Sequence, residues 1–241
     1  DENRDVERFL SLQTNICNDY QLSDEEEECW LRNSVNSTGL VDYIKANASQ
    51  IDRIMTGPYL FGLVEAVALA VPDKVLLIPC LHDEPFARVR RIQAMFRAVR
   101  GFLFNTEPEQ MLAHRLISDL APKVEAVIAM GIEPFEVDKN AFAKRTGITA
   151  PYVIYSGRRE PLKGTPILVD FFACFRERTG KDIKLVMTGS GHVDVPEGLR
   201  KHFIDLGFVS EQEKREAMAG AIAFIHPSVN ESLSIVILEA W

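Results

Sequence analysis

The sequence has few of the features that mark secreted, metal-binding or nucleic-acid-binding proteins. It contains only four cysteines, and none of them belongs to a Cys-x-x-Cys pair. Disulfide and zinc-binding patterns are therefore excluded, and a reducing cytoplasm is the expected location. Acidic residues outnumber basic ones, which gives a net charge of −8. This charge argues against nucleic acid as the main partner, because phosphates favour a basic surface.

Long hydrophobic runs and glycine-rich nucleotide loops are also missing. The most apolar stretch, YLFGLVEAVALAVP at residues 59–72, is expected to be a buried helix, because a membrane span needs about 20 apolar residues. No secretory signal is visible. The order Lys-Gly-Thr at residues 163–165 does not fit a Walker P-loop, and GSGHVD at residues 189–194 lacks the third glycine of a dinucleotide fingerprint. We interpret GSGHVD as a tight turn that lets the backbone approach a ligand.

Short β-rich apolar runs alternate with longer helical patterns, which predicts an α/β protein with parallel strands. In the first half, strands are expected at residues 52–56, 75–79, 101–105 and 124–129. In the second half, strands are expected at residues 152–156, 183–188, 203–206 and 223–226, and helices at 165–178 and 211–219. The acidic run at residues 23–28 is expected to be a solvated helix face or helix start.

The halves are separated by a polar, weakly periodic segment. It predicts a partial N-terminal domain over residues 1–133, a linker over 134–150 and a partial C-terminal domain over 151–241. The chain begins without Met, and no closing strands follow its last helical pattern. We interpret it as part of a longer two-domain enzyme, with both domains truncated.

A cationic loop follows the strand expected at residues 152–156. In YSGRREPLKG, residues 155–164, Gly157 precedes two arginines and Lys163, and Thr-Pro at 165–166 is a helix start. Cations between a strand and a helix, at the carboxyl edge of a parallel sheet, suggest an anion-binding site. From this segment alone, a solvated basic loop is an equal alternative.

Two acids frame the last apolar run, HPSVNESLSIVILEAW at residues 226–241. Glu231 precedes a helix expected to begin near Ser232 or Ser234, and Glu239 lies inside that helix. Eight helical residues span roughly 12 Å, about the reach from the sugar to the ribose of a nucleotide sugar. The first N–H groups of the helix would face the diphosphate between them. One such ligand would explain both acids and the serines.

Together these motifs resemble those of the retaining glycosyltransferases of family 4, which have the GT-B fold. Glu231 and Glu239 match the E-x7-E signature, residues 155–164 the GR…KG loop, and LVMTGSG at 185–191 the strand and turn that follow it. Residues 203–241 match the LGxVs…hPS…E…LEA run nearly throughout. The first half is similar more loosely, through IPCLHDEPFARV (78–89), GFLFNTEPE (101–109) and MGIEPFEV (130–137).

The resemblance implies two Rossmann-like domains that face each other across a cleft. It implies transfer of a sugar from a nucleoside-diphosphate sugar to an acceptor hydroxyl, with retained anomeric configuration and without a metal or other cofactor. Arg158 and Lys163 would bind the diphosphate and stabilise the leaving group. Glu231 would hold sugar hydroxyls, and Glu239 the ribose.

Further donor contacts are implied for the two loop glycines and for the last loop. Gly157 and Gly189 would lie beside the donor, backbone N–H groups of Ser232, Leu233 and Ser234 would bind sugar and phosphate oxygens, and Phe208 and Val209 would lie near the nucleobase. Many family members have Gly-Phe-Gly where this chain has Ser-Leu-Ser. The loop geometry is expected to differ, because serine restricts positive φ. Arg159 is expected to be solvated.

In the first half, His82 follows a buried strand, where open α/β sheets place site residues. We predict that it contacts the donor sugar or phosphate, and that Asp83 and Glu84 orient it or help to bind the acceptor. The other histidines are interpreted as structural or exposed, with His226 as a candidate support for the site.

Bacterial members of the family often build surface polysaccharides, so the expected acceptor is a saccharide or a lipid-linked one at the inner face of the plasma membrane. The basic segment 86–100 could touch anionic lipid, but packing on the sheet as an amphipathic helix is favoured. The alternatives are a GT-B sugar-nucleotide epimerase or phosphorylase, and a non-catalytic nucleotide-sugar-binding protein. The ordered motifs argue against the former, and the retained acids and cations against the latter.

Overall fold

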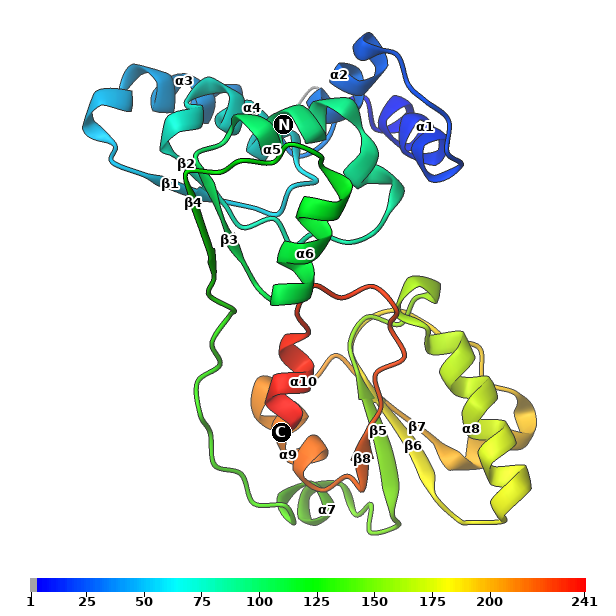
Figure 1. The fold of residues 1–241 in the computed structure, drawn as a ribbon. Helices are drawn as coiled ribbons and strands as arrows, with labels where there is room; N and C mark the ends of the chain where they lie inside the picture. The colour runs from blue at the N-terminus through cyan, green and yellow to red at the C-terminus, as the bar shows by residue number, and fades with distance from the viewer. Residues whose placement is uncertain (1–3) are drawn as a thin grey trace. The chain divides into compact units, whose positions relative to one another are not determined.

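Two parallel four-stranded sheets organise residues 4–241, the part of the chain that the computed structural model describes (Figure 1). Each sheet belongs to its own α/β unit: the first unit ends at Met130, and the second comprises Gly131–Trp241. The alternation of strands and helices predicted from the sequence is confirmed in both units. Within residues 4–241, no helix is long and apolar enough to cross a membrane.

The first sheet has the strand order β1-β2-β3-β4. Its strands are β1 (Ile54–Thr56), β2 (Val75–Leu77), β3 (Gly101–Phe104) and β4 (Val124–Val127), each shorter than predicted. The helices between them are α4 (Gly62–Ala70), η2 (Pro72–Lys74), η3 (Pro85–Arg88), α5 (Arg90–Ala98) and α6 (Glu107–Leu116). Because each strand lies beside the next one in sequence, right-handed crossovers direct these helices to one face of the sheet.

Three helices and one short 3₁₀ turn precede the first sheet: α1 (Val6–Cys17), α2 (Asp24–Arg32), α3 (Thr38–Ala46) and η1 (Ala48–Gln50). The ring of Trp30 stacks between Phe9 and Phe86, with centroid distances of 6.4 and 5.6 Å. This stack joins α1 and α2 to the segment after β2. Full burial of each such side chain contributes about 1.5–3 kcal/mol to stability, so the helices share one core with the sheet.

Two acids that the sequence places in helices are buried. The stretch at residues 59–72 contains the buried helix α4, as predicted, and its Glu65 pairs with Arg91 at 2.7 Å. Burial raises the pKa of Glu65, and the Arg91 guanidinium opposes that shift. The acidic run at residues 23–28 does start a helix, through a capping box of Ser23. The expectation of a solvated face is wrong for Glu27, which is buried because its carboxylate accepts the first N–H groups of α5.

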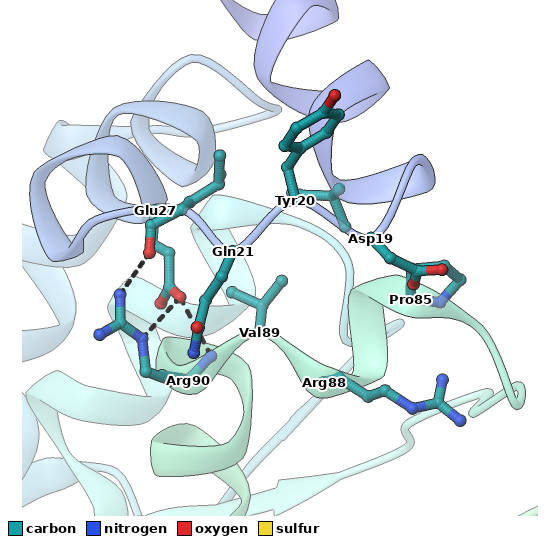
Figure 2. A pocket seen from close by; sticks show the side chains of 10 residues that line it. Asp19, Tyr20, Gln21, Glu27, Pro85, Arg88, Val89 and Arg90 are labelled. Carbon is teal, nitrogen blue, oxygen red and sulfur yellow. Dashed lines mark hydrogen bonds and ion pairs between the residues drawn. The ribbon is translucent and has the colours of Figure 1, made fainter.

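The basic segment 86–100 is neutralised within the first unit. A hollow of about 290 Å³ lies beside the start of α5. Arg90 and Glu27, which line it, are joined by hydrogen bonds (Figure 2). Other charged pairs of the segment are Arg88–Asp83, Arg90–Asp24, Arg91–Glu65, Arg91–Glu28 and Arg97–Asp119. These pairs favour the packing interpretation of this segment over a free lipid-binding surface.

The second sheet has the order β7-β6-β5-β8. Its strands are β5 (Tyr152–Ser156), β6 (Lys184–Thr188), β7 (Phe203–Gly207) and β8 (Ala223–Phe224). The helices of the second unit are α7 (Ala141–Thr146), η4 (Pro161–Lys163), α8 (Thr165–Thr179), η5 (Glu197–His202), α9 (Glu211–Ala219) and α10 (Ile235–Ala240). The sheet grows from β5 to β7 in one direction, and β8 is then added on the other side of β5. The strand order therefore reverses at β5, which is where open α/β sheets form a ligand crevice.

Both faces of the second sheet are covered, α8 lying on one side and α7 with α9 on the other (Figure 1). Successive residues of β5 point to opposite faces: Tyr155 packs with α8, whereas Ile154 packs with α9. The segment 134–150, predicted as a linker, contains α7. Phe142 of this helix is buried against Tyr152, with ring centroids 5.2 Å apart. The helix was missed because its six residues are too few for a clear periodic pattern.

Candidate functional site

The loops after β5 and β8 meet at the point where the strand order of the second sheet reverses. The loop after β5 ends at Gly164, which has a φ of +70°. A Cβ at this position would lie 2.7 Å from the carbonyl oxygen of Pro227. Glycine therefore lets the two loops pack closely, and this contact brings Lys163 to the segment that follows β8.

Lys163 and Glu231 form an ion pair between these loops. Their Nζ and Oε1 atoms are 2.6 Å apart, and the side chains are 26% and 23% exposed. Nε2 of His226 lies 3.1 Å from the same carboxylate oxygen and 3.4 Å from Oγ of Ser234. The structure thus brings together the cationic loop and the first acid, 68 positions apart in sequence. His226, named as a candidate support, contacts Glu231 directly.

These contacts set the ionisation of Glu231. Its burial works against the charged form, but hydrogen bonds from Lys163, Ser228 and His226 and the charge of Lys163 outweigh it. The pKa of Glu231 is therefore lowered, and the carboxylate is ionised at neutral pH. The pair can offer an ammonium and a carboxylate to the same ligand.

We expect the contribution of this pair to stability to disappear at low pH. The pKa of Glu231 is lower in the folded protein than the unfolded value of about 4.3. The carboxylate therefore stabilises the fold above the unfolded pKa, and this contribution is lost as the pH falls through the folded pKa. The Tm difference between the protein and Glu231→Gln should be constant from about pH 8 to 5 and shrink below about pH 4.

Thermal unfolding followed by circular dichroism across this pH range measures that difference. Glu197→Gln is the matched control, because its carboxylate is 83% exposed and should give no pH-dependent difference of comparable size. A Tm difference between the protein and Glu231→Gln that grows as the pH falls would contradict a lowered pKa.

The Lys163–Glu231 pair lines a hollow of about 330 Å³ within the second unit. Its walls come from the end of β5 and the loop after it, from α9, from the segment between β8 and α10, and from the first turn of α10. The lining residues are Tyr155, Ser156, Gly157, Lys163, Lys214, His226, Glu231, Leu233, Ser234, Ile235 and Val236. Small-molecule sites usually measure about 300–1,000 Å³. The hollow is therefore large enough for part of a ligand, and its polar groups suit phosphate or hydroxyl oxygens.

The two arginines of the loop have opposite environments. Arg158 is exposed, pairs with Glu160 at 3.4 Å and is not among the residues that line the hollow. The expectation of a solvated Arg159 is wrong, since its side chain is only 3% exposed and pairs with Asp205. Its guanidinium also donates to the carbonyl oxygen of Gly189. Arg159 therefore ties together the carboxyl ends of β5, β6 and β7.

The loop glycines are required by contact between backbones. Gly189 has a φ of +115°, and a Cβ there would lie 2.0 Å from the carbonyl oxygen of Gly157. The chain bends at residues 189–190, within the segment predicted as a tight turn, and the backbone that approaches it is that of Gly157. Gly157 lines the hollow, whereas Gly189 does not. The structure therefore assigns Gly189 a part in loop packing.

The Ser-Leu-Ser segment does not need the backbone conformation that glycine favours. Ser234 caps α10 with a φ of −94°, and neither Ser232 nor Leu233 has a positive φ. Serine is therefore accommodated here without strain. Leu233 and Ser234 line the hollow. The aliphatic run that follows is only partly covered, since no residue of α10 is fully buried.

Glu239 lies apart from Glu231. It lines a separate hollow of about 350 Å³, together with Phe135 and Arg215, and not the one that contains the Lys163–Glu231 pair. Its side chain is 11% exposed and pairs with Lys214, which lines the Lys163–Glu231 hollow. Sequence reasoning missed Lys214, because a lysine in the polar helix α9 carries no local signal of a partner on α10.

Phe208 and Val209 follow the end of β7, as the motif requires. Phe208 is 88% exposed, and neither residue lines the Lys163–Glu231 hollow. An exposed ring at the carboxyl edge of the sheet is available for stacking against a planar group. Its role at the nucleobase stays a prediction.

The site residues predicted in the first half, His82 for the donor and Asp83 and Glu84 for the acceptor side, lie in the first unit after β2. Asp83 pairs with Arg88 and Arg115, and the hydrogen bond from Arg88 holds the pKa of Asp83 below its usual range. Glu84 accepts a hydrogen bond from the buried Tyr59 hydroxyl at 2.6 Å. No hydrogen bond from His82 to either acid is found among residues 4–241. The prediction that these acids orient His82 or help to bind the acceptor stays a prediction.

Comparison with known proteins finds a family model that matches most of the second unit. Residues 137–241 match the family model "Glycosyl transferases group 1". Within residues 4–241, no group of three or more His, Cys, Asp or Glu residues is arranged to hold a metal ion. No curated protein matches the chain.

The fold is that of GT-B glycosyltransferase structures. Anabaena Alr3699/HepE in complex with UDP-glucose is similar with a TM-score of 0.64 and 20% identity, over 83% of this chain and 60% of that one. The alpha,alpha-trehalose 6-phosphate synthase of Burkholderia multivorans is similar with a TM-score of 0.65 and 13% identity. The similarity covers 97% of this chain and 65% of the synthase chain. WaaG, a glycosyltransferase involved in lipopolysaccharide biosynthesis, is similar with a TM-score of 0.50 and 20% identity. The similarity covers 64% of this chain and 46% of the WaaG chain. The chain thus spans 60% of the HepE structure that it matches.

Proposed function

We propose that this protein is a retaining glycosyltransferase of family 4, which transfers a hexosyl group from a nucleoside-diphosphate sugar to an acceptor hydroxyl. The observation that carries this proposal is the Lys163–Glu231 pair, 2.6 Å long, in a hollow at the reversal point of the second sheet. The pair lies within the region that matches the glycosyl transferases group 1 model. HepE, a similar structure, was determined with UDP-glucose.

In this proposal Lys163 stabilises the leaving group. An ammonium has three N–H donors, and only Glu231 accepts one from Lys163 among the described residues. The other two can donate to diphosphate oxygens, whose negative charge grows as the sugar–phosphate bond breaks. Arg158 is the exposed cation of the same loop and can turn toward the phosphates. Glu231, held by Lys163 and His226, can accept hydrogen bonds from sugar hydroxyls.

The proposed chemistry needs no nucleophile from the protein. The acceptor oxygen forms a bond to the anomeric carbon on the face from which the phosphate leaves, and the sugar–phosphate bond breaks. The configuration is retained because the new bond forms on the face from which the phosphate leaves. The acceptor proton passes to the departing phosphate oxygen. We propose that no metal is required, because Lys163 and Arg158 can balance the diphosphate charge. Glu239 is proposed to serve the ribose end of the donor.

We propose a saccharide or lipid-linked acceptor and a role in bacterial polysaccharide or glycoconjugate synthesis, in the cytoplasm at the inner face of the plasma membrane. The similarity to WaaG, a glycosyltransferase involved in lipopolysaccharide biosynthesis, supports the polysaccharide role. Acceptor contacts are proposed for Asp83 and Glu84, and a contact with the donor sugar or phosphate is proposed for His82. All three residues follow β2 at the carboxyl edge of the first sheet.

A thermal-shift panel of UDP-, GDP-, ADP- and TDP-sugars tests the donor site. We expect one nucleotide to raise the Tm selectively, since a ligand at 100 times its Kd stabilises the protein by about 2.7 kcal/mol. The shift should be lost in Lys163→Ala and should be the same with and without Mg²⁺. Stabilisation by none of the nucleotides would contradict the proposal. Conversion of the nucleotide sugar without an acceptor would identify an epimerase instead.

A further inference from the structure

The hollow beside the start of α5, called the Arg90 hollow below, lies entirely within the first unit (Figure 2). One of its walls is the connection between α1 and α2, and the other is the segment from Pro85 to Arg90. The Arg90 guanidinium joins the two walls, because it donates to the carbonyl oxygen of Leu22 at 2.6 Å and to Glu27 at 3.0 Å. The walls are therefore fixed by contacts within the protein. None of the site residues predicted from the sequence lines this hollow.

The buried part of the Arg90 hollow is apolar. Ile16, Leu22 and Val89 line it, and each of these side chains is less than one tenth exposed. Small-molecule sites combine an apolar lining of this kind with a few polar groups that fix the orientation of the ligand. The hollow therefore offers a surface for the carbon-bound hydrogens of a ligand.

The exposed rim carries hydrogen-bonding groups that the protein does not use. Asp19, Tyr20 and Gln21 are exposed and line the hollow. In the part of the chain that the structure describes, their side chains make no hydrogen bond to another residue. A carboxylate accepts hydrogen bonds, and an amide both donates and accepts them. In Figure 2 the Gln21 side chain extends toward the wall formed by Val89 and Arg90. These groups suit the hydroxyls of a ligand.

The charges of the lining favour a neutral ligand. Both guanidiniums are already paired with acids, Arg88 with Asp83 and Arg90 with Glu27. The two arginines and the two acids of the lining, Asp19 and Glu27, together carry no net charge. The unpaired Asp19 carboxylate repels a phosphate or carboxylate group, and the neighbouring guanidiniums repel a cation. A neutral molecule with hydroxyls on its edge and carbon-bound hydrogens on its face fits both the rim and the apolar part.

We propose that the Arg90 hollow binds one neutral pyranose ring of a saccharide. The face of the ring lies on the apolar part, its hydroxyls donate to Asp19 and exchange hydrogen bonds with Gln21, and the exposed ring of Tyr20 borders it. The volume of about 290 Å³ is at the lower end of the usual range of about 300–1,000 Å³, so it suits a single sugar ring rather than a nucleotide sugar. The inference goes beyond the proposed function, and it does not depend on the donor site.

The test titrates the whole chain with the methyl glycosides of glucose, galactose, mannose and N-acetylglucosamine, followed by saturation-transfer difference NMR. We expect at least one of them to bind with a Kd of about 1 mM, a usual affinity for a ligand of this size. Asp19→Asn should weaken that binding about tenfold, because a neutral acceptor replaces a charged one. Gln21→Leu should weaken it about two- to tenfold, the usual effect of losing one neutral hydrogen bond. Methyl glucuronide, which carries a carboxylate, should bind less tightly than methyl glucoside.

Asp119→Asn and Gln50→Leu are the matched controls, since both residues are exposed in the first unit and lie outside the hollow. Asp119 also shares the positive φ of Asp19, 63° against 59°, and asparagine tolerates that conformation. Both control variants should keep the full affinity for the glycoside.

Absence of binding by all four glycosides would overturn the inference. So would an unchanged affinity in both Asp19→Asn and Gln21→Leu, or tighter binding of methyl glucuronide than of methyl glucoside. Asp19→Asn and Gln21→Leu should keep the Tm shift that a nucleotide sugar produces, because they lie in the first unit and the proposed donor site in the second. Glycoside binding without any nucleotide-dependent shift would contradict the proposed function and still support this site.

Discussion

Replacing Lys163 by alanine is expected to lower the turnover number of sugar transfer by about 10²–10³-fold, the usual effect of removing one preorganised donor at a developing negative charge. Lys163 lies 2.6 Å from Glu231 in a hollow where both side chains are largely covered. Its loss removes the cation proposed to balance the leaving diphosphate. The substitution also leaves the Glu231 carboxylate without its ammonium partner, so that only His226 neighbours the carboxylate oxygen. The unbalanced negative charge of Glu231 then repels the diphosphate of the donor. Steady-state kinetics with the nucleotide sugar found in the thermal-shift panel measures the change.

Two further variants make this result specific to the site. Lys181→Ala removes an exposed lysine that does not line the hollow, and it should leave the turnover number unchanged. Glu231→Gln keeps the size of the side chain but removes its charge, and it should also lower turnover. Circular dichroism establishes that each variant is folded. If Lys163→Ala and Glu231→Gln both turned over normally, the assignment of the site would be wrong.

The largest effect on stability is expected for Gly189→Ala. The new Cβ would lie 2.0 Å from the carbonyl oxygen of Gly157, and the φ of +115° disfavours any L side chain. Backbone cannot move aside as a side-chain end can, so the clash and the strain both remain. We expect the free energy of unfolding to fall by about 3–5 kcal/mol. Urea denaturation followed by circular dichroism measures this loss.

Gly198→Ala is the matched control for that substitution. Gly198 lies in η5 with a negative φ, and a Cβ there would meet nothing within 4 Å. Its replacement should change the free energy of unfolding by no more than about 0.5 kcal/mol. Nucleotide binding should also weaken in Gly189→Ala, because Gly157 lines the Lys163–Glu231 hollow. A Gly189→Ala variant as stable as Gly198→Ala would show that the two loops are not packed as described.

The secondary structure was largely determined by the sequence alone. β5 and α9 occupy the ranges predicted for them, Tyr152–Ser156 and Glu211–Ala219. Both carry strong local signals: the strand is apolar because it is covered on two faces, and the helix begins with a capping box of Ser210 and Glu213. Such signals lie within a few residues of each other, so no knowledge of the rest of the chain is needed. The same holds for the family motifs that named Lys163 and Glu231.

The tertiary structure alone decided which charged residues are buried and what they contact. Arg159 and Lys214 lie in polar segments that look solvated in sequence, yet Asp205 and Glu239 cover them from elements 46 and 25 positions away. The spacing of Glu231 and Glu239 suggested one shared site, but packing of α9 against α10 puts Lys214 between them. Charge burial depends on partners that only folding brings near. The sequence therefore determined the elements and the motif, and the fold decided how its charges are paired.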